Sequence, residues 1–228
     1  MLQSAINAIL RSFALEGLSS EGSLLTVKIK DVVTIKVKPH MRKRAEKLAE
    51  RKLGYRRTED GKLVKVGEDN IYKRYPWPTE KRWEKIYLGE MAEEAAKEFM
   101  DTLGIEYICY NDCREDDFKD EDPFDFRIRD IRIDLKSSKD NRNHGLEEIL
   151  KQQHLVTPID QTVKPIIIQA FISHDEKQVW LTCWATDSEL KQQENIGYLH
   201  WQPGKYYLLN VKDCHPMSEL KQYLKKNL

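Results

Sequence analysis

Two aspartates and a lysine, Asp125, Asp134 and Lys136, lie within a short stretch of the chain in which polar and apolar residues alternate. Carboxylates suit a hard divalent cation: Mg²⁺ accepts one or two of them and keeps positions for water and phosphate oxygens. A lysine beside such a cation can hold a phosphate or orient the attacking water. These residue types therefore predict a metal-dependent site that acts on phosphodiester bonds.

The stretch around these residues predicts the β-hairpin that positions them. Residues 124–138, FDFRIRDIRIDLKSS, are apolar at every second position on both sides of Arg129-Asp130, which indicates two strands sharing one buried face. With a two-residue turn at Arg129-Asp130, facing residue numbers sum to 259, and Asp125 stands opposite Asp134. Two carboxylates about 4 Å apart repel by about 4 kcal/mol at an effective dielectric of 20. A cation would relieve this repulsion; the alternative is an ordinary hairpin with a charged outer face.

The same residues resemble the PD-(D/E)xK signature of the restriction-endonuclease-like nuclease superfamily. Asp125 stands for the first acid and Asp134-Leu135-Lys136 for the acid-x-Lys triplet, while Pro123 is separated from Asp125 by Phe124. An acid-x-Lys triplet occurs seven times in this chain. Only the triplet at Asp134 lies in an alternating strand with an acid at the pairing position and a predicted helix upstream. The resemblance covers about residues 83–184.

The resemblance implies a fold and a set of roles. The fold would be α/β, a restriction-endonuclease-like core with a mixed central β-sheet flanked by helices, here with an additional N-terminal basic α+β region. Asp125 and Asp134 would bind Mg²⁺, for which Mn²⁺ can substitute, and Lys136 would orient the attacking water. The activity would be that of a nuclease, a hydrolase of phosphodiester bonds, with DNA favoured as the substrate of an endonuclease.

The resemblance also implies a third acid, on the helix predicted over residues 80–103. In the family this acid precedes an aromatic residue and a helix-ending glycine, and with Phe99 and Gly104 as markers the matching position is Glu93. Glu93 would be a catalytic residue that binds the metal directly or through water. Glu90, three residues earlier on the same side, is the second candidate.

Two further polar residues are weaker candidates for the site. Gln169 is the only polar residue in the interior of the apolar run over residues 163–173, between Pro165 and Ile172, so a buried amide there could bind a water or a phosphate. Ser137 follows the triplet directly and could donate a hydrogen bond to phosphate.

The charge distribution points to nucleic acid as a partner. Residues 1–82 hold 19 Lys and Arg against 10 Asp and Glu, a net charge of +9, and the remaining 146 residues hold 19 against 28, a net charge of −9. A basic region beside an acidic one fits a DNA-binding part joined to a carboxylate-bearing catalytic part. Two halves that attract one another are the alternative. Cations on the helix predicted over residues 39–54 would contact phosphates: Arg42, Lys43, Arg44, Lys47 and Arg51.

At 228 residues the chain can hold one large domain or a core with a smaller module. The charge division suggests a nucleic-acid-binding basic α+β region over residues 1–80 and a nuclease core over residues 81–228. No apolar run reaches the roughly 20 residues that span a bilayer, and the N-terminus lacks the pattern of a signal peptide. Four scattered cysteines without a C-x-x-C pair fit free thiols in a reducing cytoplasm. A homodimer would let two sites cut two strands.

Two other classes of function stay open on the sequence. One is a catalytically inactive nucleic-acid-binding protein with a nuclease-like fold, against which the intact Asp-Asp-Lys set argues. The other is a partner-binding α/β protein without a metal, in which the basic region docks an acidic partner.

Hydrophobic periodicity and turn residues predict the remaining elements. Helices are expected over residues 3–17, 39–54, 80–103 and from about 145. Strands are expected within residues 23–38, around a turn at Asp60-Gly61, and over residues 105–110, 163–173 and 177–186.

Overall fold

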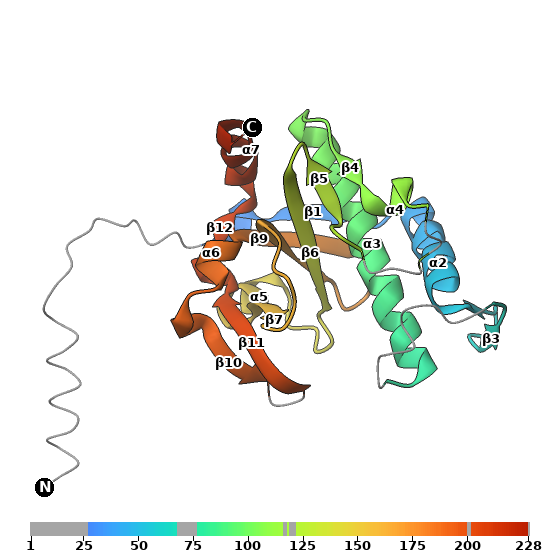
Figure 1. The fold of residues 1–228 in the computed structure, drawn as a ribbon. Helices are drawn as coiled ribbons and strands as arrows, with labels where there is room; N and C mark the ends of the chain where they lie inside the picture. The colour runs from blue at the N-terminus through green and yellow to red at the C-terminus, as the bar shows by residue number, and fades with distance from the viewer. Residues whose placement is uncertain (1–26, 68–76, 116–117, 119–121, 200–201, 228) are drawn as a thin grey trace, which may run out of the picture.

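A mixed sheet of seven strands forms the centre of the described part of the chain (Figure 1). The computed structural model describes residues 27–67, 77–115, 118, 122–199 and 202–227. The strand order is β1-β9-β8-β6-β5-β4, and β12 also pairs with β9. Strands β6 and β8 are parallel, and the other neighbours are antiparallel. The strands are β1 (Val33–Lys36), β4 (Ile108–Cys109), β5 (Phe126–Ile128), β6 (Ile131–Lys139), β8 (Ile166–Ile172), β9 (Gln178–Thr186) and β12 (His215–Pro216).

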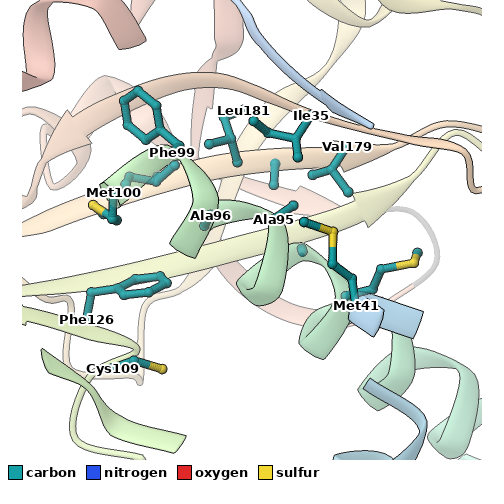
Figure 2. Packing of buried hydrophobic residues seen from close by; sticks show 14 of the residues in the cluster. Ile35, Met41, Ala95, Ala96, Phe99, Met100, Cys109, Phe126, Val179 and Leu181 are labelled. Atoms are coloured by element: carbon teal, nitrogen blue, oxygen red, sulfur yellow. The ribbon is translucent and has the colours of Figure 1, made fainter. Parts of the chain in front are cut away.

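Helix α3 (Thr79–Leu103) packs along one face of this sheet. It ends where Gly104 takes φ 63°, a left-handed conformation that glycine adopts without strain. Ala95 and Ala96 are fully buried, and such small side chains let the helix approach the sheet closely. Figure 2 shows these alanines with Phe99 of α3 among apolar side chains of the strands. Helix α2 (Pro39–Leu53) lies beside α3 and contributes to the same core.

The opposite face of the sheet is also buried. Along β8, Ile166 and Ile168 face the α3 side, whereas Ile167 and Phe171 belong to a second apolar cluster. This explains the nearly continuous apolar sequence of the strand, since a strand covered on both faces has no polar side. The second cluster includes residues of α5 (Leu146–Gln152) and of a smaller sheet, ordered β10-β11-β7.

The remaining elements surround these two cores. The smaller sheet consists of β7 (His154–Pro158), β10 (Ile196–Leu199) and β11 (Gln202–Asn210), and β2 (Tyr55–Arg57) pairs with β3 (Leu63–Lys65) in a separate hairpin. Among the described residues, the other α-helices are α4 (Tyr110–Cys113), α6 (Asp187–Leu190) and α7 (Met217–Asn227). Single 3₁₀ turns occupy η1 (Ile29–Asp31), η3 (Gln193–Asn195) and η4 (Val211–Asp213).

The hairpin that the alternating sequence predicts is present. Its facing pairs are Phe126 with Ile133, Arg127 with Arg132, and Ile128 with Ile131, which all sum to 259. The ladder ends at Phe126, where the prediction continued it to an Asp125–Asp134 pair. Instead the N–H of Asp125 donates to the carbonyl of Ile133, 3.1 Å away. The chain therefore leaves the regular ladder at the first predicted acid.

Several predicted elements are confirmed. Helices begin and end close to the expected positions over residues 39–54 and 80–103 and from about 145, and the turn at Asp60-Gly61 joins β2 and β3. The strands predicted within residues 163–173 and 177–186 are β8 and β9. The α/β class and the mixed central sheet flanked by helices are likewise observed.

Two strand predictions are wrong in extent. The strand expected over residues 105–110 is reduced to the two residues of β4, because α4 begins at Tyr110. Of the strands expected within residues 23–38, the described part keeps only β1, and η1 occupies Ile29–Asp31. The helix predicted over residues 3–17 lies outside the described residues.

The basic region predicted over residues 1–80 shares its packing with the rest of the chain. Strand β1 pairs with β9 in the central sheet, and Met41 and Ala45 of α2 lie in the same apolar cluster as residues of α3. In the part of the chain that the structure describes, no helix is long and apolar enough to cross a membrane.

Candidate active site

Helix α3 carries two glutamates into the interior beside the central sheet. Glu90 and Glu93 are each only 5% exposed, three residues apart on the buried side of the helix. A buried carboxylate is unfavourable unless neighbouring groups hydrogen-bond it or balance its charge. The partners of these two glutamates therefore decide what each can do.

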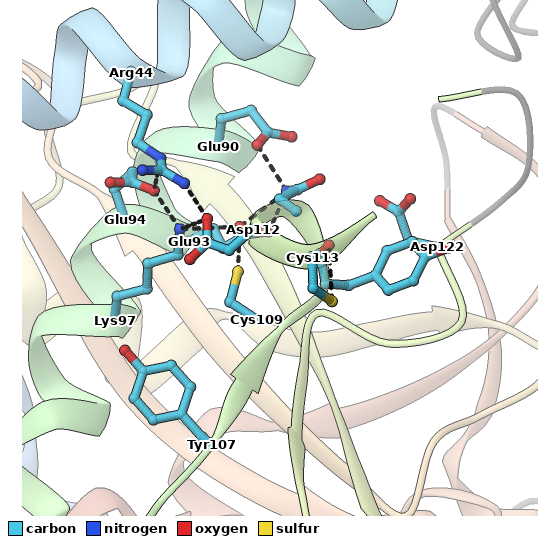
Figure 3. Close-up of polar contacts among 12 residues, drawn as sticks. Arg44, Glu90, Glu93, Glu94, Lys97, Tyr107, Cys109, Asp112, Cys113 and Asp122 are labelled. Carbon is cyan, nitrogen blue, oxygen red and sulfur yellow. Dashed lines mark hydrogen bonds and ion pairs between the residues drawn. The ribbon is translucent and has the colours of Figure 1, made fainter. Parts of the chain in front are cut away.

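A polar network supplies those partners (Figure 3). The side-chain amide of Asn111 donates to Oε2 of Glu90 at 3.0 Å and to both carboxylate oxygens of Glu93, at 2.9 and 2.7 Å. Lys52 Nζ lies 2.7 Å from Oε1 of Glu90, and Cys109 Sγ donates to Oε1 of Glu93 at 3.1 Å. Glu90 is thus held in an ion pair, whereas Glu93 has hydrogen-bond donors but a weaker balance of charge.

The pKa of Glu93 is raised to about 7. Burial is the main cause, followed by the charge of Glu90, while the hydrogen bonds from Asn111 act in the opposite direction. A carboxyl with such a pKa is easily ionised by a nearby cation and easily protonated without one. This property is expected of a carboxylate in a site that binds a positively charged ligand.

Asp125 lies just before β5, at the point where the hairpin ladder ends. Its Oδ2 accepts a hydrogen bond from the N–H of Leu135 in β6 at 2.5 Å, which fixes the carboxylate against the neighbouring strand. The pKa of Asp125 lies well above its usual range. Burial of the carboxylate contributes most, and the charges of Asp134 and Glu93 follow. The carboxylates of Asp134 in β6 and Glu93 in α3 are therefore close enough to Asp125 to disfavour its ionisation.

Lys136 stands next to these acids. Its Nζ lies 2.7 Å from Oδ2 of Asp134, and both side chains are partly exposed, 27% and 19% respectively. The two residues are separated by one position in β6, so their side chains share a face of the strand. The charge of Lys136 lowers the pKa of Asp125, against the larger effects that raise it.

The two weaker candidates also lie at this place. Gln169 of β8 pairs with Lys136 in the parallel ladder, and its buried amide donates to the carbonyl of Ala170 at 2.9 Å. Ser137 lies where α3 passes close to β6: a Cβ added at Gly89 would meet its Oγ at 3.9 Å.

These residues open into one cleft. A cavity of about 980 Å³ is lined by Glu93, Asp125, Lys136, Ser137 and Gln169, and also by Glu90 and Lys52. Asp134 contacts the lining residue Lys136. A cavity of this size is large enough to hold a segment of a substrate.

The donor set fits a magnesium ion that keeps several of its waters. Among the described residues, no three acid, histidine or cysteine side chains stand close enough to hold a metal by themselves. Mg²⁺ does not require such a cage, because it commonly uses one or two carboxylates and completes its shell with water and phosphate oxygens. Asp125 and Asp134 repel each other, and a divalent cation would reverse that repulsion.

The cations predicted to contact nucleic acid on α2 are largely engaged within the chain. Arg42 donates to Tyr87 Oη at 3.2 Å and contacts Glu176; Arg44 pairs with Glu94 at 2.8 Å and with Asp112; Arg51 lies over the ring of Phe118 at 4.7 Å. Lys43 and Lys47 are exposed. The attraction between a basic and an acidic half, the alternative that the charge distribution left open, is present as these contacts.

Three residues of the network around Glu93 were not predicted from the sequence: Lys52, Cys109 and Asn111. Lys52 had a local signal, since it falls on the apolar side of α2 with Leu48 and Ala49, where a charge needs a partner. Asn111 and Cys109 had no local signal in the sequence, because only the packing of β4 and α4 against α3 brings them to Glu93.

Comparisons of this chain with protein-family models, with curated proteins and with solved structures find no match.

Proposed function

We propose that this protein is a metal-dependent nuclease that hydrolyses phosphodiester bonds, with DNA as the favoured substrate. The observation that carries the proposal is a cleft lined by Glu93, Asp125 and Lys136, with Asp134 paired to Lys136. Burial raises the pKa of Asp125 most, and the charges of Asp134 and Glu93 raise it further, so a cation bound beside Asp125 would be favoured.

Asp125 and Asp134 would hold Mg²⁺ or Mn²⁺, with Glu93 as a further ligand directly or through a water. When bound, the metal would lower the pKa of a coordinated water and neutralise the charge that develops on the phosphoryl oxygens. It would also remove the repulsion among the carboxylates, so that occupation of the site stabilises the fold.

The chain's own groups perform the remaining tasks. Lys136 presents an ammonium to the cleft, where it can donate a hydrogen bond to a phosphate oxygen or to the attacking water. The N–H of Leu135 fixes the carboxylate of Asp125, and Asn111 fixes that of Glu93. Both carboxylates are therefore oriented before a substrate enters, which is the condition for efficient electrostatic stabilisation.

The order of elements is compatible with this proposal. From α3 onward the chain forms a helix, a short strand, the β5–β6 hairpin, a helix and then β8, with α4 and β7 as additional short elements. The helix–strand–hairpin–helix–strand order agrees with that expected from the resemblance. The restriction-endonuclease-like core is part of the proposal.

The test is cleavage of a panel of substrates. The full-length protein is incubated with supercoiled, linear, single-stranded and branched DNA and with RNA, in Mg²⁺, in Mn²⁺ and in EDTA. Cutting that requires the metal supports the proposal, and the preferred substrate narrows the activity. No cutting of any substrate, together with no Mg²⁺ binding by calorimetry, refutes it and favours a partner-binding protein. Nucleic-acid binding without cutting favours the inactive binding protein.

A further inference from the structure

The cleft extends beyond the carboxylates, and cationic side chains line this further part. Its lining includes Lys81 and Lys85 of the first turns of α3, and Arg142 of the loop that follows β6. These residues come from segments far apart in the sequence but line the same cavity as Lys136. The cavity thus combines an acidic centre with basic surroundings.

Lys81 and Lys85 are held close to each other in spite of their equal charge. They are four residues apart on one helix, so they lie on the same face. Both approach the ring of Trp77, with centroid distances of 6.0 Å for Lys81 and 4.1 Å for Lys85. The pKa of Lys85 is lowered, first by partial burial and then by the charge of Lys81, while Glu84 acts in the opposite direction.

Some of the cations that line the cleft form an ion pair with a carboxylate, whereas others do not. Lys139 also lines it but pairs with Glu176 at 2.5 Å. Within the described part of the chain, Lys81, Lys85 and Arg142 form no ion pair with a carboxylate. Two neighbouring lysines without a counter-ion are unfavourable by themselves and become favourable when an anion binds between or beside them.

We infer that Lys81, Lys85 and Arg142 hold the phosphate backbone of the nucleic acid where it enters the carboxylate site, an inference that rests on the proposed nuclease function. The first turns of α3, and not the basic helix α2, then form the main contact with the substrate. On α2 the arginines are engaged with Glu176, Glu94 and Phe118. Trp77 contacts both lysines through its ring.

The chain offers a matched pair of double variants. Lys81→Gln/Lys85→Gln removes two exposed lysines four residues apart on α3. Lys43→Gln/Lys47→Gln removes two exposed lysines with the same spacing on α2, away from the cleft lining. Both double variants lower the net charge by the same amount, so a general effect of charge would weaken DNA binding equally in the two. Thermal unfolding of the two variants provides the control for folding.

Binding of a fluorescein-labelled DNA duplex and of the corresponding single strand is measured by anisotropy, in EDTA and at several salt concentrations. The α3 variant is expected to bind about tenfold to a hundredfold more weakly near 0.1 M salt, and its plot of log K against log salt should be flatter by about 1.8 for the duplex. The α2 variant should bind almost as the wild type does. Arg142→Gln should flatten the plot by about 0.9.

Equal losses in both variants, a larger loss in the α2 variant, or no binding by the wild type would overturn the inference. Because EDTA prevents turnover, this result is independent of cleavage. A wild type that binds through α3 but cuts nothing would refute the nuclease proposal and support the inference. A protein that cuts DNA while its α3 variant binds normally would refute the inference alone.

Discussion

Substitution of Lys52 tests whether its buried ion pair with Glu90 contributes as much stability as the distances and the burial imply. The Lys52 side chain is 3% exposed, and its Nζ lies 2.7 Å from Glu90, whose side chain is 7% exposed, and 3.3 Å from Asp122. Removing one partner of a buried ion pair leaves an uncompensated charge and costs about 3–5 kcal/mol. Lys52→Met keeps most of the aliphatic volume, so the loss of charge dominates. At about 2–4 °C per kcal/mol for a chain of this size, the melting temperature should fall by roughly 6–20 °C.

Urea unfolding of two further variants separates the buried charge from other effects. Lys38→Met removes an exposed partner, since Lys38 and Glu98 lie 2.6 Å apart with 48% and 37% exposure, and it should cost about 1 kcal/mol or less. Lys52→Met/Glu90→Gln removes both charges while an oxygen remains for Asn111, and should recover most of the loss. A cost below about 1 kcal/mol for Lys52→Met, or no recovery in the double variant, would refute the reasoning.

Three other perturbations have defined outcomes. Lys136→Ala should abolish cleavage while it changes the free energy of unfolding by about 1 kcal/mol or less, because the side chain is partly exposed; cleavage at the wild-type rate would contradict its role. Phe126→Ala should destabilise by about 3–5 kcal/mol in urea unfolding, since the ring is fully buried, and a loss under 1 kcal/mol would contradict the core. His215→Asn should destabilise most between pH 4.5 and 6.5. Burial raises the pKa of Glu189, but hydrogen bonds outweigh this effect and lower the pKa to about 2. The stability that these hydrogen bonds contribute is therefore lost as the pH falls below 4.5. The hydrogen bond to Glu189 raises the pKa of His215 against burial, a contribution lost as pH rises above 6.5. Urea midpoints from pH 2 to 9 check this, and a pH-independent difference would contradict it.

The parts of the fold that local patterns determine could be predicted from the sequence. Alternation alone sets the register of the β5–β6 hairpin, because a slip by one residue would expose Ile131 and Ile133. The end of α3 follows from Gly104, and the apolar run of β8 follows from burial on both faces. In each case the information lies within a few residues of the element.

The details of the site depend on packing between distant segments and could not be read in this way. The alternating pattern extends through Asp125, yet the chain leaves the ladder there, and the carboxylate reaches the N–H of Leu135 instead of facing Asp134 across a regular pair. Lys52 and Asn111 approach Glu90 and Glu93 only because α2 and α4 dock on α3. No spacing in the sequence specifies that docking.

The charge distribution along the sequence left two interpretations open, a nucleic-acid-binding surface and an attraction between the two halves. The net positive charge of residues 1–82 suggested a nucleic-acid-binding surface on α2. In the folded chain, Arg42 and Arg44 contact acids of the second half, so part of the asymmetry is neutralised internally. Among the described residues, the cleft cations without a carboxylate partner are Lys81 and Lys85 of α3 and Arg142 of the loop after β6, none of which was singled out from the sequence.

The central claim is that Asp134 acts as part of a carboxylate site and not as an ordinary ion-pair partner of Lys136. Asp60 is a matched control, because it begins another acid-x-Lys triplet, and its Oδ2 lies 2.9 Å from Nζ of Lys62 on an exposed turn. The decisive measurement is the Mg²⁺-dependent cleavage rate of the best DNA substrate by the wild type, Asp134→Asn and Asp60→Asn. The proposed site predicts cleavage lost in Asp134→Asn and unchanged in Asp60→Asn. Equal rates in the two variants, or cleavage that persists in EDTA, would contradict it.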